Sequence, residues 1–140
     1  MVFVPGWSAT VGLFDPSSNT FTRGPSVGSA GQHKFWGGVL LSDGRVVFVH
    51  NTFAKVGLFD PSTNTITSGP NVGSGRSNSW GGVLLPDGRV VFVPRDSATV
   101  GMFDPSIGTS TTCTRKPAYT LSQPLPPSWN VALLPYYNKY

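Results

Sequence analysis

One phrase recurs three times along this chain at nearly even spacing. ATVGLFDPS at 9–17 returns as AKVGLFDPS at 54–62 and as ATVGMFDPS at 98–106, a spacing of 45 and then 44 residues. A second phrase, WGGVLL, begins at 36 and again at 80. A repeat of this length indicates a solenoid, a propeller or a tandem array, in which each unit buries its apolar face only against its neighbours.

Each repeat predicts four short strands joined by tight turns. In the second unit the predicted strands cover 36–41, 45–49, 55–59 and 65–68. The Asp-Gly pair after the first strand predicts a two-residue hairpin, and Asp60-Pro61 begins the turn between the last two strands. Asn19 and Asn64 occupy a left-handed position in these turns, where the third unit has Gly108.

The apolar residues of the first two strands favour an all-β fold with covered sheets. The stretches 39–41 and 46–49 are apolar on both faces, which requires a layer on each side of the sheet. Four-stranded antiparallel sheets stacked around an axis meet that requirement, as in the blades of a β-propeller. The 17 glycines and 13 prolines agree with many turns and few helices.

The repeat resembles that of the kelch and galactose-oxidase-like propellers over about residues 1–112. LLPDGRVVFV is similar to the strand-turn-strand core of that family, and GLFDPSTNTIT to its Tyr-Asp-Pro segment. Two features depart from the family pattern. Its Gly-Gly pair is replaced by Pro5, His50 and Pro94, and its tryptophan by Phe21, Ile66 and Ser110. The resemblance implies a propeller fold, but the repeats contain no tyrosine for copper chemistry of the galactose-oxidase type.

We expect one repeat domain over residues 1–140, with about three blades and an incomplete ring in a single copy. Blade 2 covers 35–70 and blade 3 covers 79–114. Blade 1 covers 1–26 and lacks a first strand, which SWNVALLP at 128–135 can supply because it resembles SWGGVLLPDG at 79–88. Closed propellers have 4–8 blades, so self-association of two copies would close a six-bladed ring. A fragment of a longer protein is the alternative.

The sequence favours no catalytic, cofactor or metal site. Five of the six aspartates precede proline or glycine in predicted turns, and there is no glutamate. General acid–base catalysis needs two carboxylates in different environments. Cys113 is the only cysteine, and His33 and His50 have no ligand partners at metal-binding spacing. We therefore expect that the chain is not an enzyme and binds no cofactor or metal.

Loops that differ between the repeats gather on one predicted face of the blades. The loop between strands two and three shares this face with the connection between blades, while the constant DGR and FDPS turns lie on the opposite face. The candidate ligand-binding residues of the variable face are Trp7, His33, Lys34, His50, Phe53, Lys55, Arg76 and Arg95. This basic and aromatic set suits an acidic protein or a glycan. The basic residues are too few and scattered for nucleic acid.

The sequence thus favours a non-enzymatic, kelch-like binding or interaction module. The alternatives are a fragment of a propeller oxidase or glycan-active enzyme, whose catalytic residues lie outside this chain, and a structural repeat protein of a surface coat. Trp36 and Trp80 are predicted as wedges between blades, and the Gly-Gly pairs after them as points of close backbone approach. We expect no membrane segment and no signal peptide, since no apolar run approaches ~20 residues and the N-terminal stretch lacks a basic region.

Overall fold

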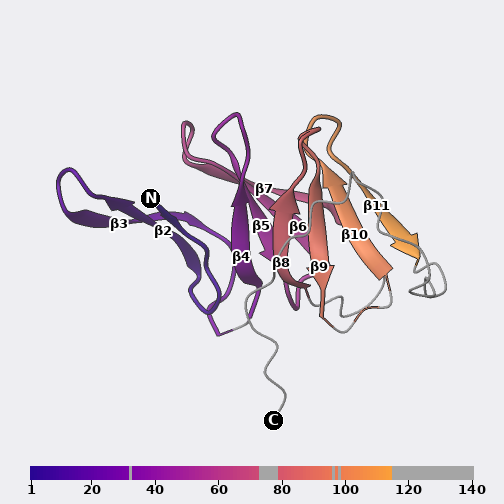
Figure 1. The fold of residues 1–140 in the computed structure, drawn as a ribbon. Coiled ribbons are helices and arrows are strands. Elements are labelled where there is room, and N and C mark those ends of the chain that lie inside the picture. The colour runs from indigo at the N-terminus through magenta and orange to yellow at the C-terminus, as the bar shows by residue number, and fades with distance from the viewer. Residues whose placement is uncertain (32, 73–78, 96, 98, 115–140) are drawn as a thin grey trace, which may run out of the picture.

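The structure, a computed structural model, describes residues 1–140 except 32, 73–78, 96, 98 and 115–140. The described residues form three antiparallel sheets and no helix, so the predicted all-β fold is confirmed. Figure 1 shows the sheets side by side in chain order. No described helix could cross a membrane.

The sheets correspond to the three repeats. Blade 1 contains β1 (Val2–Phe3), β2 (Thr10–Asp15) and β3 (Thr20–Ser26). Blade 2 contains β4 (Phe35–Leu40), β5 (Val46–His50), β6 (Lys55–Asp60) and β7 (Thr65–Asn71). Blade 3 contains β8 (Ser79–Leu84), β9 (Val90–Pro94), β10 (Thr99–Asp104) and β11 (Thr109–Thr114). These strands coincide closely with the predicted ones, except that β7 runs on to Asn71.

Every strand pairs with its neighbour in the chain, so each sheet is a simple meander. The first strands of blades 2 and 3, β4 and β8, contact each other along the inner edge of the stack (Figure 1). Blade 1 starts at β1, and no described residue of the chain supplies it with a strand equivalent to β4 or β8. The strand predicted at 128–135 lies outside the described residues.

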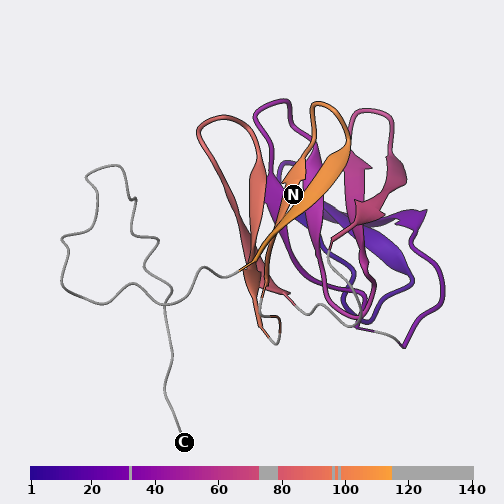
Figure 2. The same cartoon turned by 90° about the vertical axis from the view of Figure 1, so that its right-hand side faces the viewer.

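The Asp-Pro turns form as predicted. Asn19 and Asn64 both have φ of 53°, and Gly108 has φ of 66°, so all three occupy the left-handed region. The carboxylate of Asp60 accepts hydrogen bonds from the backbone nitrogen of Ser62 at 2.8 Å and from its hydroxyl at 2.6 Å. In blades 2 and 3 the hairpin turns lie together at one end of the sheets, at the top of Figure 2.

The Asp-Gly hairpins differ from the prediction. The backbone nitrogen of Leu41 donates to the Arg45 carbonyl at 2.8 Å, and that of Gly44 donates to the Leu41 carbonyl at 3.1 Å. The loop therefore has three residues, Ser42 to Gly44, and only the glycine has positive φ, at 89°. Asp43 instead accepts a hydrogen bond from the Arg45 backbone nitrogen at 3.0 Å, which holds the aspartate in a type I turn.

The core lies between the sheets, as two apolar clusters. The cluster between blades 1 and 2 contains Val11, Phe35, Val46, Phe48 and Phe59. The cluster between blades 2 and 3 contains Val39, Leu41, Val47, Val49, Val56, Val72, Val90, Phe92 and Phe103. All five residues of β5 are buried, because this strand is covered by a blade on each side. The predicted coverage of both faces is thus confirmed for the central sheet.

Valine side chains pack directly against glycine backbone where the blades meet. A Cβ added to Gly82 would lie 2.8 Å from Cγ2 of Val39. A Cβ added to Gly101 would lie closer still to Cγ1 of Val72. The first glycine of the Gly-Gly pair, Gly81, faces open space. In the Gly81-Gly82 pair, only the second glycine is therefore a point of close backbone approach.

Alanine substitutions test this packing. We expect Gly101→Ala to lower the free energy of unfolding by about 1–3 kcal/mol, because the new methyl group overpacks against Val72. Gly81→Ala is the matched control, since its methyl group meets no atom within 4 Å. Urea denaturation followed by circular dichroism measures both. Equal midpoints for the two variants would contradict the proposed contact.

Candidate functional site

Five exposed or half-buried side chains form a continuous row along the inner edge of the blades. Trp36 and Trp80, on β4 and β8, have ring centroids 6.1 Å apart. The imidazole of His33 stacks on Trp36 at 5.2 Å, and Trp7 meets His33 edge-on at 4.3 Å. At the other end, the guanidinium carbon of Arg95 lies 4.5 Å from the ring centroid of Trp80. We call Trp7, His33, Trp36, Trp80 and Arg95 the aromatic row.

A β-bulge places each tryptophan of the inner strands. Phe35 pairs with His50 and Gly37 pairs with Val49, so Trp36 between them has no partner across the sheet. The same register shift surrounds Trp80 in β8. A bulge turns the extra side chain away from the regular alternation of the strand. Trp36 and Trp80 are accordingly 43% and 57% exposed.

Backbone hydrogen bonds between loops fix the start of the row. The nitrogen of Gly31 donates to the carbonyl of Trp7 at 3.0 Å. The carbonyl of His33 accepts from the backbone nitrogen of Thr52 at 3.1 Å and from its hydroxyl at 2.8 Å. Loops of blade 1, of the first inter-blade connection and of blade 2 therefore meet on one face, as the repeat comparison predicts.

The structure brings together only some of the candidate ligand-binding residues. Trp7, His33 and Arg95 belong to the aromatic row. Phe53 is 40% exposed and packs beside Phe35 rather than in the row. Lys55 is exposed on β6. Arg76 lies outside the described residues.

Lys34 and His50 are both 1% exposed, so the expectation that they lie on an open loop face is wrong. The ammonium group of Lys34 donates to the carbonyl of Ser29 beneath the loop. Nε2 of His50 lies 3.1 Å from the hydroxyl of Ser79, and the imidazole meets the ring of Phe92 edge-on at 4.9 Å. A position in or beside a loop favours a polar residue, but it does not predict whether the side chain of that residue points to solvent or into the protein.

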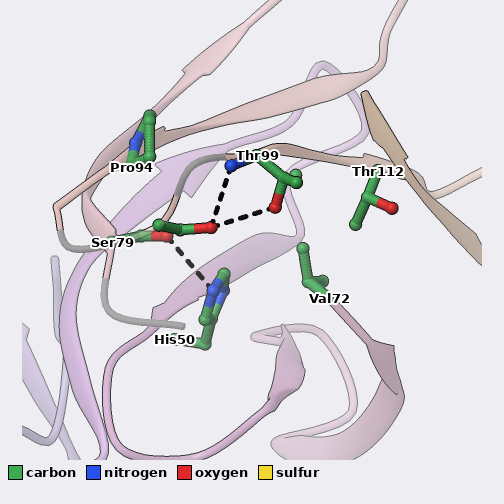
Figure 3. A pocket seen from close by; sticks show the side chains of 8 residues that line it. His50, Val72, Ser79, Pro94, Thr99 and Thr112 are labelled. Carbon is green, nitrogen blue, oxygen red and sulfur yellow. Dashed lines mark hydrogen bonds between the residues drawn. The ribbon is translucent and has the colours of Figure 1, made fainter. Parts of the chain in front are cut away.

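Figure 3 shows the small pocket beside His50, between blades 2 and 3. Ser79, Thr99 and Thr112 contribute polar groups to it, and Val72 contributes an apolar wall. Its volume is about 10 Å³, which suits one water molecule rather than an organic ligand. We interpret this pocket as a polar contact between blades.

Trp36 and Trp80 are the functional candidates that sequence reasoning missed. They were predicted as wedges between blades, but the two rings are 43% and 57% exposed. The signal was present in the sequence, since each tryptophan stands before two glycines at the start of a strand. Glycine in a strand marks a bulge or a close backbone approach, and a bulge would have turned these rings outward.

The opposite face carries five of the six aspartates, and the structure uses these five in turns. Hydrogen bonds from the hydroxyl and backbone of Ser17, and from Ser18, lower the pKa of Asp15 from 3.8 to about 2. Hydrogen bonds from Arg45 lower the pKa of Asp43. Similar contacts lower the pKa of the equivalent turn carboxylates, Asp60, Asp87 and Asp104. Among the described residues, no group of three or more His, Cys or acidic side chains could hold a metal ion.

These pKa shifts predict a loss of stability in acid. A carboxyl whose pKa is lower in the folded chain stabilises the fold above its unfolded pKa of 3.8, and this contribution is lost as the pH falls towards 2. The melting temperature should therefore decrease between about pH 4 and pH 2. Asp15→Asn, which keeps an acceptor but cannot titrate, should show a shallower decrease. An unchanged slope would contradict the role of this turn.

Comparisons with known proteins give a fold and no sequence family. No protein-family model matches the sequence, and no curated protein matches it. The chain is similar to the solved structure of virginiamycin B lyase from Staphylococcus aureus, with 18% identity, a TM-score of 0.68, and coverage of 81% of this chain and 36% of that one. The fold is that of a β-propeller.

A second similar structure is a catalytically inactive histidine-to-alanine variant of virginiamycin B lyase from Staphylococcus aureus with quinupristin. It is 17% identical with a TM-score of 0.64, and the match covers 79% of this chain and 35% of that chain. This chain therefore spans about a third of the length of the lyase structures. At such identities the likeness shows the fold, and it does not extend to the finer assignment of a kelch repeat.

The comparisons correct one expectation from the sequence. We expected a chain that is not an enzyme, because five of its six aspartates are predicted turn residues and its histidines and cysteine have no partners at catalytic or metal-binding spacing. Both similar structures belong to an enzyme, so this expectation is contradicted. The aspartate pattern describes only the turn face, while the aromatic row lies on another part of the blades.

Proposed function

We propose that this chain is a ligand-binding propeller module, and that the aromatic row binds a glycan with an acidic group. The observation that carries this proposal is the unbroken contact of four exposed or half-buried rings across three blades. Large exposed apolar side chains that lie together are typical of binding surfaces. The kelch-like repeat motif is part of the same proposal, as a divergent version of a unit used in binding propellers.

The chemistry of the row favours a sugar ring. The apolar face of a pyranose packs on an indole, and Trp36 and Trp80 present two indoles at successive positions. Arg95 places a cation at the end of this surface, beside Trp80. A guanidinium pairs well with a carboxylate or sulfate, which would select an acidic sugar over a neutral one.

Glycan-array retention tests this proposal. Trp36→Ala and Trp80→Ala should each weaken retention of acidic glycans about tenfold, which corresponds to ~1.4 kcal/mol. Arg95→Ser should weaken retention of acidic glycans more than that of neutral ones. Ile107→Ala is the matched control, because this residue is 70% exposed but lies in a turn away from the row. No retention by the parent chain, or equal retention by all variants, would overturn the proposal.

A second candidate function follows from the position of His33. Virginiamycin B lyase is inactive when one histidine becomes alanine, and quinupristin is the compound with that variant. A lyase needs a group that accepts a proton, and a neutral imidazole can do so near pH 7. His33 is held between Trp7 and Trp36 at the row, where a ligand would contact it. This chain would then supply part of a lyase-like active site.

Quinupristin distinguishes the two candidates. If the lyase-like function holds, quinupristin should quench the tryptophan fluorescence of the chain. It should also be converted to a product on incubation, which liquid chromatography with mass spectrometry would detect. His33→Ala should abolish the change, while Lys55→Ala, an exposed residue away from the row, should not. Quenching without chemical change would favour a binding module. If quinupristin causes no quenching and is not converted, it is excluded as a ligand.

A further inference from the structure

Within the described residues, the three stacked blades leave two flanks uncovered by another sheet, one on blade 1 and one on blade 3. The same repeat positions are buried where two blades of this chain meet, since each apolar cluster draws residues from neighbouring blades. Comparison of equivalent positions therefore shows which contacts each end of the stack lacks.

On blade 3, valines are exposed whose counterparts are buried. Val100 is 37% exposed, whereas Val11 and Val56 at the same repeat position are fully buried. Val83 is 38% exposed, whereas its counterpart Val39 is 7% exposed. No sheet of the described residues thus covers on blade 3 the valine face that is covered on the other blades.

On blade 1, a phenylalanine is exposed whose counterparts are buried. Phe3 is 48% exposed, whereas Phe48 and Phe92 at the same repeat position are 0% and 1% exposed. Phe21, which is 60% exposed, lies beside Phe3 with ring centroids 6.0 Å apart. Both rings line an open hollow on this flank, together with Gly12.

The two flanks are the halves of an interface that the chain already builds twice. Val11 of blade 1 lies in one apolar cluster with Phe48 of blade 2. Val56 of blade 2 lies in the next cluster with Phe92 of blade 3. A third contact of the same kind would join the exposed valines of blade 3 to the exposed Phe3 on blade 1 of another copy. Within one chain, blades 1 and 3 lie on opposite sides of blade 2 (Figure 1).

We propose that a second copy of this chain covers both flanks, with blade 3 of each copy packed against blade 1 of the other. A head-to-tail contact of this kind closes into a ring when its rotation permits. The described residues of each copy form three sheets, and closed propellers have 4–8 blades. Two copies would bring six of these described sheets, a number within this range. Burial of the exposed valines and phenylalanines drives the association.

Light scattering on a sizing column measures the mass directly. The parent chain should elute at about twice its mass of 14.9 kDa. Val100→Lys and Phe3→Lys, on opposite flanks, should each shift the mass to that of a single chain, because each variant buries an unpaired ammonium group in an apolar contact. Both side chains are already exposed in the single copy, so the circular dichroism spectrum should not change.

Ile107→Lys is the matched control, since it also replaces an exposed apolar residue but lies in the turn between β10 and β11, where φ of the next residue is positive. This variant should remain a dimer. A parent chain with the mass of one copy at its highest soluble concentration would overturn the proposal. So would a larger assembly, or a dimer that persists in both flank variants.

Discussion

The packing of valine side chains onto glycine backbone holds the blades together. Val39 on Gly82 and Val72 on Gly101 bring the sheets closer than any Cβ would allow. Such contacts are sensitive to volume because interiors are close-packed. The strands in contact can then be apolar on both faces, and β5 is buried along its full length. The arrangement of the inner strands, and hence of the aromatic row, depends on this approach.

The aromatic row is formed by side chains from all three described blades together. A single blade supplies one bulged tryptophan, and one exposed ring gives little selectivity. When β4 and β8 lie side by side, Trp36 and Trp80 come within 6.1 Å, and loops from blade 1 add Trp7. Function therefore has to be argued from the row and not from the fold.

The repeat predicted most of the fold and only part of the site. Strand positions and the left-handed residues Asn19 and Asn64 followed from periodicity and from local backbone preferences. The Asp-Gly loop was predicted wrongly as a two-residue hairpin. The backbone and side chain of Arg45 donate hydrogen bonds to the carboxylate of Asp43, and these bonds favour a turn in which Asp43 is not left-handed. Lys34 was misplaced for a different reason. Its burial depends on a contact with the Ser29 carbonyl, and repeat comparison contains no information on such individual contacts.

The bulge at Trp36 and Trp80 has a consequence for how such a surface can diverge. A residue without a partner across the sheet contributes no cross-strand pair, so its replacement leaves the ladder on either side intact. Blades 2 and 3 therefore each offer one position where a side chain can change with little penalty to folding. Successive blades around an axis would place these substitutable positions next to one another on one surface. The ligand preference of a relative could then be rewritten one blade at a time, on an unaltered scaffold.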